Sequence, residues 1–335
     1  MKIVIDAMGG DFAPLVVVEG VCEASKLYSD TEFILVGDTI KIKECLKLKK
    51  IELPSTVELY HCSEVVGMNE SPVSAIRKKK DSSVLVAVEL VKEGKADALV
   101  TAGNTGAAVA ATTLKWRMLE GIDRPGIALP LPNSENVSVL LDVGANILCR
   151  PIHYLQYAIM GKVYSEYILK KKNNRIGLLN VGEEEGKGGE DMILAHNMLK
   201  ENCQGFIGNV EGRDIYNGKC DVIVCDGFVG NIVLKVSEGL IETLMAFTKK
   251  ALKSNLISFF GAMLSKSAFS KLKKNLDYSE YGGAPLLGVN GICIISHGGS
   301  SAKAIKSAIR VAREFIKDNV NQHIIEEIRD CHGKQ

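Results

Sequence analysis

Residues 1–11 read MKIVIDAMGGD, in which the short apolar run KIVID (2–6) is followed closely by two glycines. Short runs with few polar side chains are typical of parallel strands that are covered on both faces. Seven further runs predict strands: EFILVG (32–37), VELYH (57–61), DALVT (97–101), VSVLLD (137–142), RIGLLN (175–180), DVIVC (221–225) and GICIIS (291–296). Together they predict a mostly parallel sheet.

Helices are expected between these strands, at residues 14–28, 83–93, 105–116, 151–170, 235–252 and 301–317. Pro14 would stand at the start of its helix, where proline is well tolerated. Such alternation is typical of an α/β fold with helices on both faces of the sheet. Because no Gly/Ser/Pro-rich linker divides the chain, we predict a single α/β domain over residues 1–335.

The 335 residues carry 41 Lys and Arg against 40 Asp and Glu, a formal net charge of +1. That balance argues against a nucleic-acid binder, which usually carries a basic excess. No uninterrupted apolar stretch is as long as a membrane-spanning helix, and the start lacks the apolar region of a signal peptide. Nine cysteines occur without a C-x-x-C pair, so we expect reduced thiols in a cytoplasmic protein, with no metal site.

Glycines gather where the predicted strands end. The six glycine-rich segments are MGGD (8–11), TAGNTGA (101–107), DVGAN (142–146), NVGEEEGKGGE (180–190), DGFVGN (226–231) and SHGGSS (296–301). Ligands of open α/β sheets bind beyond the carboxyl ends of strands, where free backbone N–H groups attract anions. Ordinary turns also use glycine. Six such loops, converging on one edge of the sheet, predict a site for a phosphate-type ligand.

Several familiar motifs are missing. There is no G-x-x-x-x-G-K-[ST], no G-x-G-x-x-G after the first strand, no G-x-S-x-G and no H-E-x-x-H. These absences argue against a P-loop nucleotide hydrolase, a dehydrogenase, a covalent serine hydrolase and a zinc protease.

The glycine-rich loops and their surroundings resemble one family. MKIVIDAMGGD, SPVSAIRKKKDSS (71–83), DALVTAGNTGA (97–107), LLDVGAN (140–146), NVGEEEGKG (180–188), CDVIVCDGFVGNIVLK (220–235) and YGGAPLLGVNGICIISHGGSS (281–301) are similar, in order, to blocks of the bacterial phosphate acyltransferases that act on acyl carrier protein, the PlsX family. The resemblance extends from residue 1 to about residue 318. The tail that follows carries no recognised signature.

The resemblance implies that the chain transfers a fatty acyl group from acyl-[acyl carrier protein] to inorganic phosphate. The acyl phosphate then serves a membrane glycerol-3-phosphate acyltransferase in phosphatidic acid and phospholipid synthesis. It also implies a homodimer with a Rossmann-like α/β/α sandwich, related to isopropylmalate dehydrogenase and phosphotransacetylase. Such a protein is cytoplasmic, is peripheral to the membrane and needs no cofactor.

Chemistry assigns candidate roles to individual residues. Phosphate is itself a nucleophile, so the enzyme has to bind a dianion, orient it and stabilise an oxyanion. His297, Asn231 and Asp6 are the candidate catalytic residues, and each has a structural alternative as a cap, a core histidine or a buried carboxylate. The candidate phosphate- and substrate-binding residues are Gly9, Gly10, Gly103, Asn104, Thr105, Lys187, Gly188, Gly298, Gly299 and Ser300.

Two charged segments suggest partners. The cluster Arg77, Lys78, Lys79 and Lys80 would suit an acidic carrier protein, although a solvated helix face has the same composition. Residues 251–276 have the pattern of an amphipathic helix with a lysine rim, which predicts a protruding membrane-contact or dimer-tip element rather than a core-facing helix. Its candidate membrane contacts are Leu256, Phe259, Phe260, Met263 and Leu264.

Two other functions remain open from the sequence. The same anion-binding loops would serve a phosphotransacetylase-like enzyme that uses acyl-CoA. A non-catalytic scaffold for lipid-synthesis proteins would share the membrane and partner surfaces but would not cleave a thioester.

Overall fold

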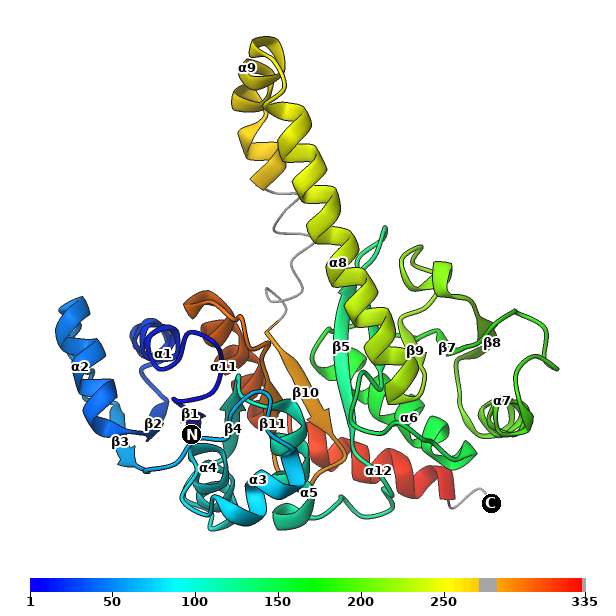
Figure 1. Cartoon of the computed structure of the whole chain (residues 1–335). Coiled ribbons are helices and arrows are strands. Elements are labelled where there is room, and N and C mark those ends of the chain that lie inside the picture. The colour runs from blue at the N-terminus through cyan, green and yellow to red at the C-terminus, as the bar shows by residue number, and fades with distance from the viewer. Residues whose placement is uncertain (271–281, 333–335) are drawn as a thin grey trace.

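The computed structural model describes residues 1–270 and 282–332 and contains one sheet of eleven strands (Figure 1). In chain order the strands are β1 (Lys2–Asp6), β2 (Glu32–Gly37), β3 (Val57–His61), β4 (Ala98–Thr101), β5 (Gly126–Pro132), β6 (Val137–Leu141), β7 (Ile176–Leu179), β8 (Phe206–Val210), β9 (Val222–Val224), β10 (Ala284–Leu287) and β11 (Cys293–Ile295).

Helices alternate with these strands as expected, and a short 3₁₀ helix lies at Gly212–Ile215. The α-helices are α1 (Leu15–Leu27), α2 (Thr39–Lys49), α3 (Pro72–Lys78), α4 (Ser83–Lys92), α5 (Thr105–Trp116), α6 (Pro151–Tyr167), α7 (Glu190–Asn202), α8 (Gly227–Leu252), α9 (Leu256–Leu264), α11 (Ala302–Lys317) and α12 (Val320–His332). The mostly parallel α/β architecture is confirmed, and all eight predicted strands are present.

The strand order is β3-β2-β1-β4-β11-β10-β5-β6-β9-β7-β8. The first five strands of this order, β3, β2, β1, β4 and β11, are parallel to one another. The last four, β6, β9, β7 and β8, are also parallel to one another. Between these two halves, β10 is antiparallel to both of its neighbours, and β5 is antiparallel to β6. The halves therefore run in opposite directions, which the sequence did not predict.

The core lies on both faces of the sheet because side chains alternate along each strand. Ile3 and Ile5 of β1 pack into one buried cluster with α1, α11 and α6, whereas Val4 between them packs into the other, with α4 and α5. Burial on both faces explains why the parallel strands read as nearly continuous apolar runs.

The tail without a recognised signature forms α12, which packs on α6 and α11. Lys162 of α6 forms an ion pair with Glu327, at 2.9 Å from Nζ to Oε2. The ring of Tyr167 stacks on that of His323, with centroids 3.9 Å apart. The tail thus belongs to the folded part of the chain.

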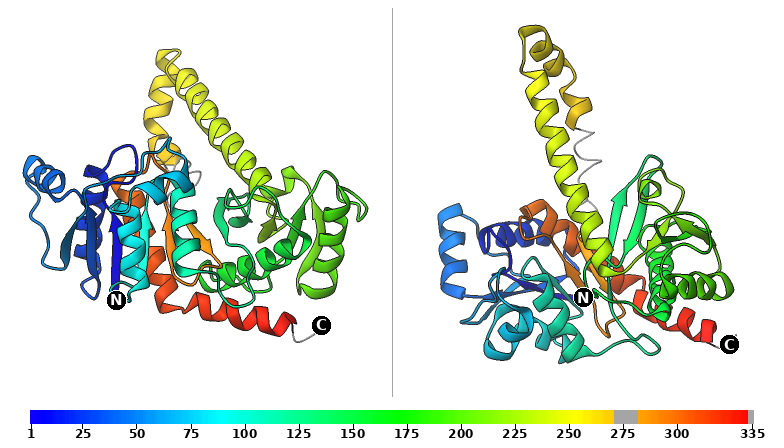
Figure 2. Two further views of the ribbon diagram at one scale, coloured as in Figure 1. Left: turned by 60° about the horizontal axis from the view of Figure 1, so that its bottom comes forward. Right: turned by 45° about the vertical axis from the view of Figure 1, so that its right-hand side comes forward.

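Helices α8 and α9 project away from the rest of the molecule in every view (Figures 1 and 2). Helix α8 begins at Gly227, eight residues before its predicted start, because the Asp226 carboxylate caps it by accepting the Val229 N–H at 2.8 Å. We call residues 238–270 the arm and the other described residues the body. No helix within the described ranges is both long and apolar enough to cross a membrane.

Candidate active site

The carboxyl ends of the two halves of the sheet meet near its centre. Strand β11 ends at Ile295, opposite Ala284 of β10. Strand β6 ends at Leu141, opposite Ala128 of β5, next to the point where β5 pairs with Leu286 of β10. The predicted convergence of all six glycine loops on one edge is therefore corrected: loops from two opposed halves face a common space between them.

That space is a cavity of about 260 Å³. It is lined by residues from four of the six predicted loops and from the start of α8, and its polar side chains are Thr105, Asn231, Lys235, Glu238, Ser296, His297 and Ser300. Ser296 is buried, and its hydroxyl has no hydrogen-bond partner among the described residues. Because an unpaired buried hydroxyl is costly, it is a natural partner for a ligand oxygen.

Two helix N-termini open onto this cavity. Thr105 and Gly106 are the first residues of α5, and Ser300 precedes α11. Asn104 caps α5 by accepting the Ala107 N–H at 3.0 Å. The first N–H groups of a helix have no partner within that helix, so this end of the cavity favours an anion.

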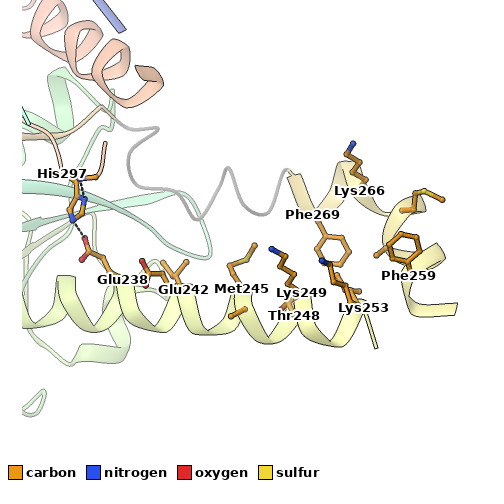
Figure 3. Close-up of a pocket in the computed structure, with 16 residues that line it drawn as sticks. Glu238, Glu242, Met245, Thr248, Lys249, Lys253, Phe259, Lys266, Phe269 and His297 are labelled. Carbon is orange, nitrogen blue, oxygen red and sulfur yellow. Dashed lines mark hydrogen bonds and ion pairs between the residues drawn. The ribbon is translucent and has the colours of Figure 1, made fainter. Parts of the chain in front are cut away.

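His297 lies where the cavity meets the arm (Figure 3). Its Nδ1 accepts the Gly299 N–H at 3.0 Å, so the neutral ring carries its proton on Nε2. Nε2 lies 4.0 Å from Oε1 of Glu238, and Oε2 of Glu238 accepts a hydrogen bond from Lys235 Nζ at 2.8 Å. The three side chains form a charged group at the mouth of the cavity.

Asn231 lies on the same side of α8 as Lys235 and Glu238, because the three are four and three residues apart. The site residues that sequence reasoning missed are Lys235, Glu238 and Ser296. The spacing 231-235-238 was visible in the sequence, but the helix was expected to begin only at residue 235. Nothing in the sequence distinguished Ser296 from the other serines of its loop.

Asp6 does not line the cavity but supports it from behind. Its carboxylate is buried and accepts hydrogen bonds from Thr101 Oγ1 at 2.9 Å and from Met8 N at 3.1 Å. Burial raises the pKa of this carboxyl, and hydrogen bonds, including one from Ser83, oppose that rise. The carboxylate therefore fixes the turn after β1 against the turn after β4.

The predicted glycines at this turn form close backbone contacts. A Cβ added at Gly9 would lie 2.6 Å from Gly103 N, and one at Gly10 would lie 2.9 Å from Gly298 O. Gly10 also has φ of 101°, which favours glycine. The loop at residues 8–11 thus contacts the loops that follow β4 and β11, and Gly9, Gly10, Gly103 and Gly298 are brought together.

Asp142 plays a similar part in the other half of the sheet. Its buried carboxylate accepts N–H groups of Ile127, Gly144, Ala145 and Asn146 at 2.8–3.1 Å. Burial raises the pKa of this carboxyl, while these four hydrogen bonds oppose the rise. The loop that carries Gly144 to the cavity is therefore held against the start of β5.

Lys187 and Gly188 lie elsewhere. Lys187 Nζ is 3.7 Å from Oε1 of Glu184, and its carbonyl accepts a hydrogen bond from Asn180 at 3.0 Å. Neither residue lines the cavity, so the structure does not bring them to the other predicted phosphate-binding residues.

The predicted basic cluster lies at the end of α3 and just beyond it. Arg77, Lys78 and Lys80 are exposed, whereas Lys79 donates to the Val65 carbonyl at 2.7 Å and pairs with Glu70. Helix α3 begins beside the cavity, because a Cβ at Gly106 would overlap the Pro72 ring. The basic cluster is thus one short helix away from the start of α5.

The five predicted membrane contacts separate into two groups. Phe259 and Met263 line a second cavity, between α8 and α9. Phe260 and Leu264 do not line it and are 56% and 87% exposed. The side chain of Leu256, together with Lys271, Lys273 and Lys274 of the predicted lysine rim, lies outside the described residues.

Cysteines near the cavity do not supply a nucleophile. Burial raises the pKa of Cys149 to about 11 and that of Cys225 well above its ordinary value. Both thiols are therefore protonated at neutral pH. No group of His, Cys, Asp and Glu side chains within residues 1–270 and 282–332 could hold a metal ion.

Comparisons with known proteins agree with this geometry. A family model described as "Fatty acid synthesis protein" matches residues 1–323. Proteins named phosphate acyltransferase from Geotalea daltonii and Heliobacterium modesticaldum are 48% and 50% identical to the chain, each over 98% of it and over 95% and 98% of their own lengths.

Solved structures share the fold. A phosphotransacetylase from Streptococcus pyogenes superposes with a TM-score of 0.63 at 19% identity, covering 95% of this chain and 94% of its own. A branched-chain phosphotransacylase from Enterococcus faecalis gives 0.57 at 14% identity, covering 94% and 98%. These structures show the fold, and the phosphate acyltransferase relatives show that the protein is an acyltransferase. More narrowly, the chain belongs to the phosphate acyltransferase family.

Proposed function

We propose that the protein transfers a fatty acyl group from acyl-[acyl carrier protein] to inorganic phosphate, which gives acyl phosphate and free carrier. The observation that carries the proposal is the central cavity, where two helix N-termini, the unpaired Ser296 hydroxyl and His297 face one another. Relatives named phosphate acyltransferase support the same reaction. The acyl phosphate would feed a membrane glycerol-3-phosphate acyltransferase in phospholipid synthesis.

The phosphate dianion occupies the end of the cavity formed by the first turns of α5 and α11. N–H groups near Thr105 and Ser300 donate to its oxygens, and the helix dipoles favour its charge. Lys235 adds a positive charge on the opposite wall. In this arrangement the turn at Gly9, Gly10, Gly103 and Gly298 keeps the two helix starts in place.

The reaction needs one proton transfer and no enzyme nucleophile. A phosphate oxygen bonds to the thioester carbonyl carbon, and the carbonyl oxygen gains negative charge near Ser296 and Asn231, which donate hydrogen bonds. The C–S bond then breaks, and the neutral His297 ring, held beside Glu238, donates its Nε2–H as a hydrogen bond to the departing thiolate. The proton of the attacking phosphate passes to this sulfur, which leaves acyl phosphate and the free thiol of the carrier.

We further propose that the carrier protein docks at the basic cluster. Arg77, Lys78 and Lys80 would attract an acidic carrier, and α3 connects them to the start of α5. A thioester on a flexible linker of the carrier protein would extend from this surface to the cavity.

The arm would place the protein at a membrane surface. Ile257, Phe260 and Leu264 recur every three or four residues on the side of α9 that faces away from the second cavity, and all three are exposed. Lys253 and Lys266 flank α9 in the sequence, are exposed and would favour anionic lipid. A cytoplasmic protein with peripheral membrane contact is the form that this surface supports.

A second apolar surface supports a homodimer. Exposed apolar side chains recur along the side of α8 that faces away from the second cavity: Phe228, Ile232, Val236, Leu240, Leu244 and Phe247. An exposed apolar stripe along a whole helix is typical of an interface between subunits. Val236→Glu with Leu240→Glu should shift sedimentation from dimer to monomer, and an unchanged sedimentation coefficient would remove this stripe as the interface.

The proposal is tested with isotopically labelled phosphate and matched acyl chains on carrier protein and on coenzyme A. We expect mass spectrometry to find labelled acyl phosphate and free carrier, with the carrier thioester the faster donor. Faster turnover of acyl-CoA would favour the phosphotransacetylase-like alternative. Membrane and partner binding without phosphate-dependent thioester cleavage would favour the scaffold. A kinetically competent acyl-enzyme would contradict direct attack.

A further inference from the structure

The second cavity, between α8 and α9, is a long groove that adjoins the central cavity and follows the arm. It has a volume of about 1100 Å³ and runs between α8 and α9 (Figure 3). Glu238 and His297 line both the groove and the central cavity. Whatever reacts beside His297 therefore lies next to the beginning of the groove.

Apolar side chains from both helices line much of the groove. Ile241, Met245 and Leu252 contribute from α8, and Phe259 and Met263 contribute from α9. Phe269 points toward α8 from the other side (Figure 3). Lys249, Lys253 and Lys266 stand at the far end, where their aliphatic stems extend the apolar surface while their charged ends reach water.

The two sides of α8 serve different purposes. Glu238, Glu242, Met245, Lys249 and Leu252 are spaced by three or four residues and face the groove. The exposed stripe from Phe228 to Phe247 lies on the opposite side of the helix. The groove is thus a separate surface from the stripe and remains open if a second chain covers the stripe.

We infer that this groove binds the acyl chain of the substrate, with the thioester beside His297 and the chain extended along α8 toward Phe259. The inference rests on the proposed function, because it needs an acyl substrate at the central cavity. It makes the side chains along α8 the determinants of chain length.

Length agrees with this assignment. From Glu238 to Leu252 the helix advances fourteen residues, about 21 Å at 1.5 Å per residue. One layer of lipid chains fills half of a bilayer core, roughly 15 Å, so the groove is long enough for a long acyl chain. Met245, about 10 Å along the helix from Glu238, lies where a chain of half that length ends.

Apolar burial supplies the affinity. Each methylene that leaves water adds to the affinity, so a chain that fills the groove binds more tightly than one that stops halfway. Binding energy from this remote part of the substrate would hold the thioester against phosphate. The groove thereby favours long chains over short ones.

The test is the chain-length profile of Met245→Trp, which narrows the groove at its middle. With labelled phosphate and carrier thioesters, we expect kcat/KM for palmitoyl to fall at least tenfold while octanoyl changes less than twofold. Thr243→Trp carries the same bulk on a part of α8 that does not line the groove, and it should keep the wild-type profile. Met245→Gln keeps the volume but adds polarity, and it should also disfavour palmitoyl.

The outcomes separate the inference from the function beneath it. If wild-type protein forms acyl phosphate and both Met245 variants keep its chain-length profile while folded by circular dichroism, the groove does not hold the acyl chain. If palmitoyl turnover is unchanged in solution but vesicle binding falls, the groove takes a membrane lipid instead, which also overturns the inference. If no thioester yields acyl phosphate with wild-type protein, the proposed function itself fails.

Discussion

The body buries its apolar side chains, whereas the arm leaves many of them exposed. In β4 of the body every residue is buried, and Ala98, Leu99 and Val100 have no exposed surface. On the arm, Phe247 is 66% exposed and Ile257 87% exposed. The body buries its own apolar surface between sheet and helices, whereas the arm offers apolar surface on three sides.

This difference separates the side chains that stabilise the fold from those that are available for binding. Side chains that pack on each other hold the fold, and changing them costs folding free energy. Apolar side chains that stay exposed along a projecting helix gain nothing for the isolated chain, so they are explained by what covers them. For this protein we propose three covers: a second subunit, the acyl chain and the membrane.

The largest effect is expected where the arm joins the body. A Cβ at Gly230 would overlap the Asp142 carbonyl oxygen, whereas one at Gly239 would meet nothing within 4 Å. Gly230→Ala should destabilise the protein by about 3 kcal/mol or more through overpacking. Gly239→Ala should be neutral or stabilise it by up to about 1 kcal/mol through helix propensity. Urea unfolding of the two variants measures both, and equal effects would remove the distinction between body and arm.

The next effect concerns the histidine at the junction. Loss of a hydrogen-bond donor to charge that develops in the transition state costs roughly 100-fold or more in rate, so His297→Ala should lower kcat by at least that factor without changing the unfolding midpoint. His61→Ala serves as the control, because His61 is an exposed histidine bonded to Thr39. A His297→Ala enzyme with wild-type kcat would return His297 to a structural role.

A smaller effect is expected at an ion pair inside the body. Although burial opposes its charge, hydrogen bonds from Arg175 and Lys171 lower the pKa of Asp221 to about 2. The stabilisation is complete above the ordinary pKa and is lost as pH falls through the folded value. The gap of nearly two pKa units predicts that Asp221→Asn costs about 2 kcal/mol at neutral pH.

Urea unfolding at several pH values checks this prediction. The difference between wild type and Asp221→Asn should narrow as pH falls from about 4 toward 2. Glu93→Gln, which breaks an exposed pair with Lys95, should leave stability unchanged at every pH. A gap between wild type and Asp221→Asn that does not vary with pH would show that the carboxylate charge is not what stabilises this corner.

The smallest effect distinguishes two neighbouring phenylalanines of the arm. Phe260 faces away from the groove, so Phe260→Asp should weaken binding to anionic vesicles about tenfold, by removing part of the 1.5–3 kcal/mol that a buried Phe contributes. Its activity in solution should persist. Phe259→Asp, one residue away but lining the groove, should instead reduce turnover of long chains. Vesicle sedimentation and solution assays on both variants decide, and identical behaviour would mean that α9 has no separate faces.

Much of the body could be predicted from the sequence because its strands are apolar runs bounded by glycine turns. The two strands that reverse the sheet were missed because GIALPLP and APLL contain proline, which argues against strands. Without these two strands, the opposition of the two halves could not be predicted. Lys187 lies apart from His297 because its loop follows β7, which β9 and β6 separate from the centre of the sheet. Asp6 was predicted to be at the site and is instead behind it, since sequence marks the end of a strand but not the direction of a side chain.

The arm was predicted only in outline. An amphipathic pattern in residues 251–276 indicates an apolar face but cannot divide Phe259 from Phe260, because that division depends on where α8 lies. The start of α8 was hidden because Gly227 and Gly230 resemble loop glycines. In the structure they let the helix pass close to Asn146 and Asp142.

The close crossing of α8 over Asp142 makes Gly230 a fulcrum. From Gly230 to Glu238 the helix measures about 12 Å, and to Leu252 about 33 Å. A tilt of about 5° around the fulcrum would move the tip by about 3 Å and Glu238 by only about 1 Å. Misplacement of reacting groups by about 1 Å already slows a reaction strongly. The tip can therefore move by up to about 3 Å to follow an uneven surface before the shift at Glu238 becomes large enough to disturb the chemistry at its base.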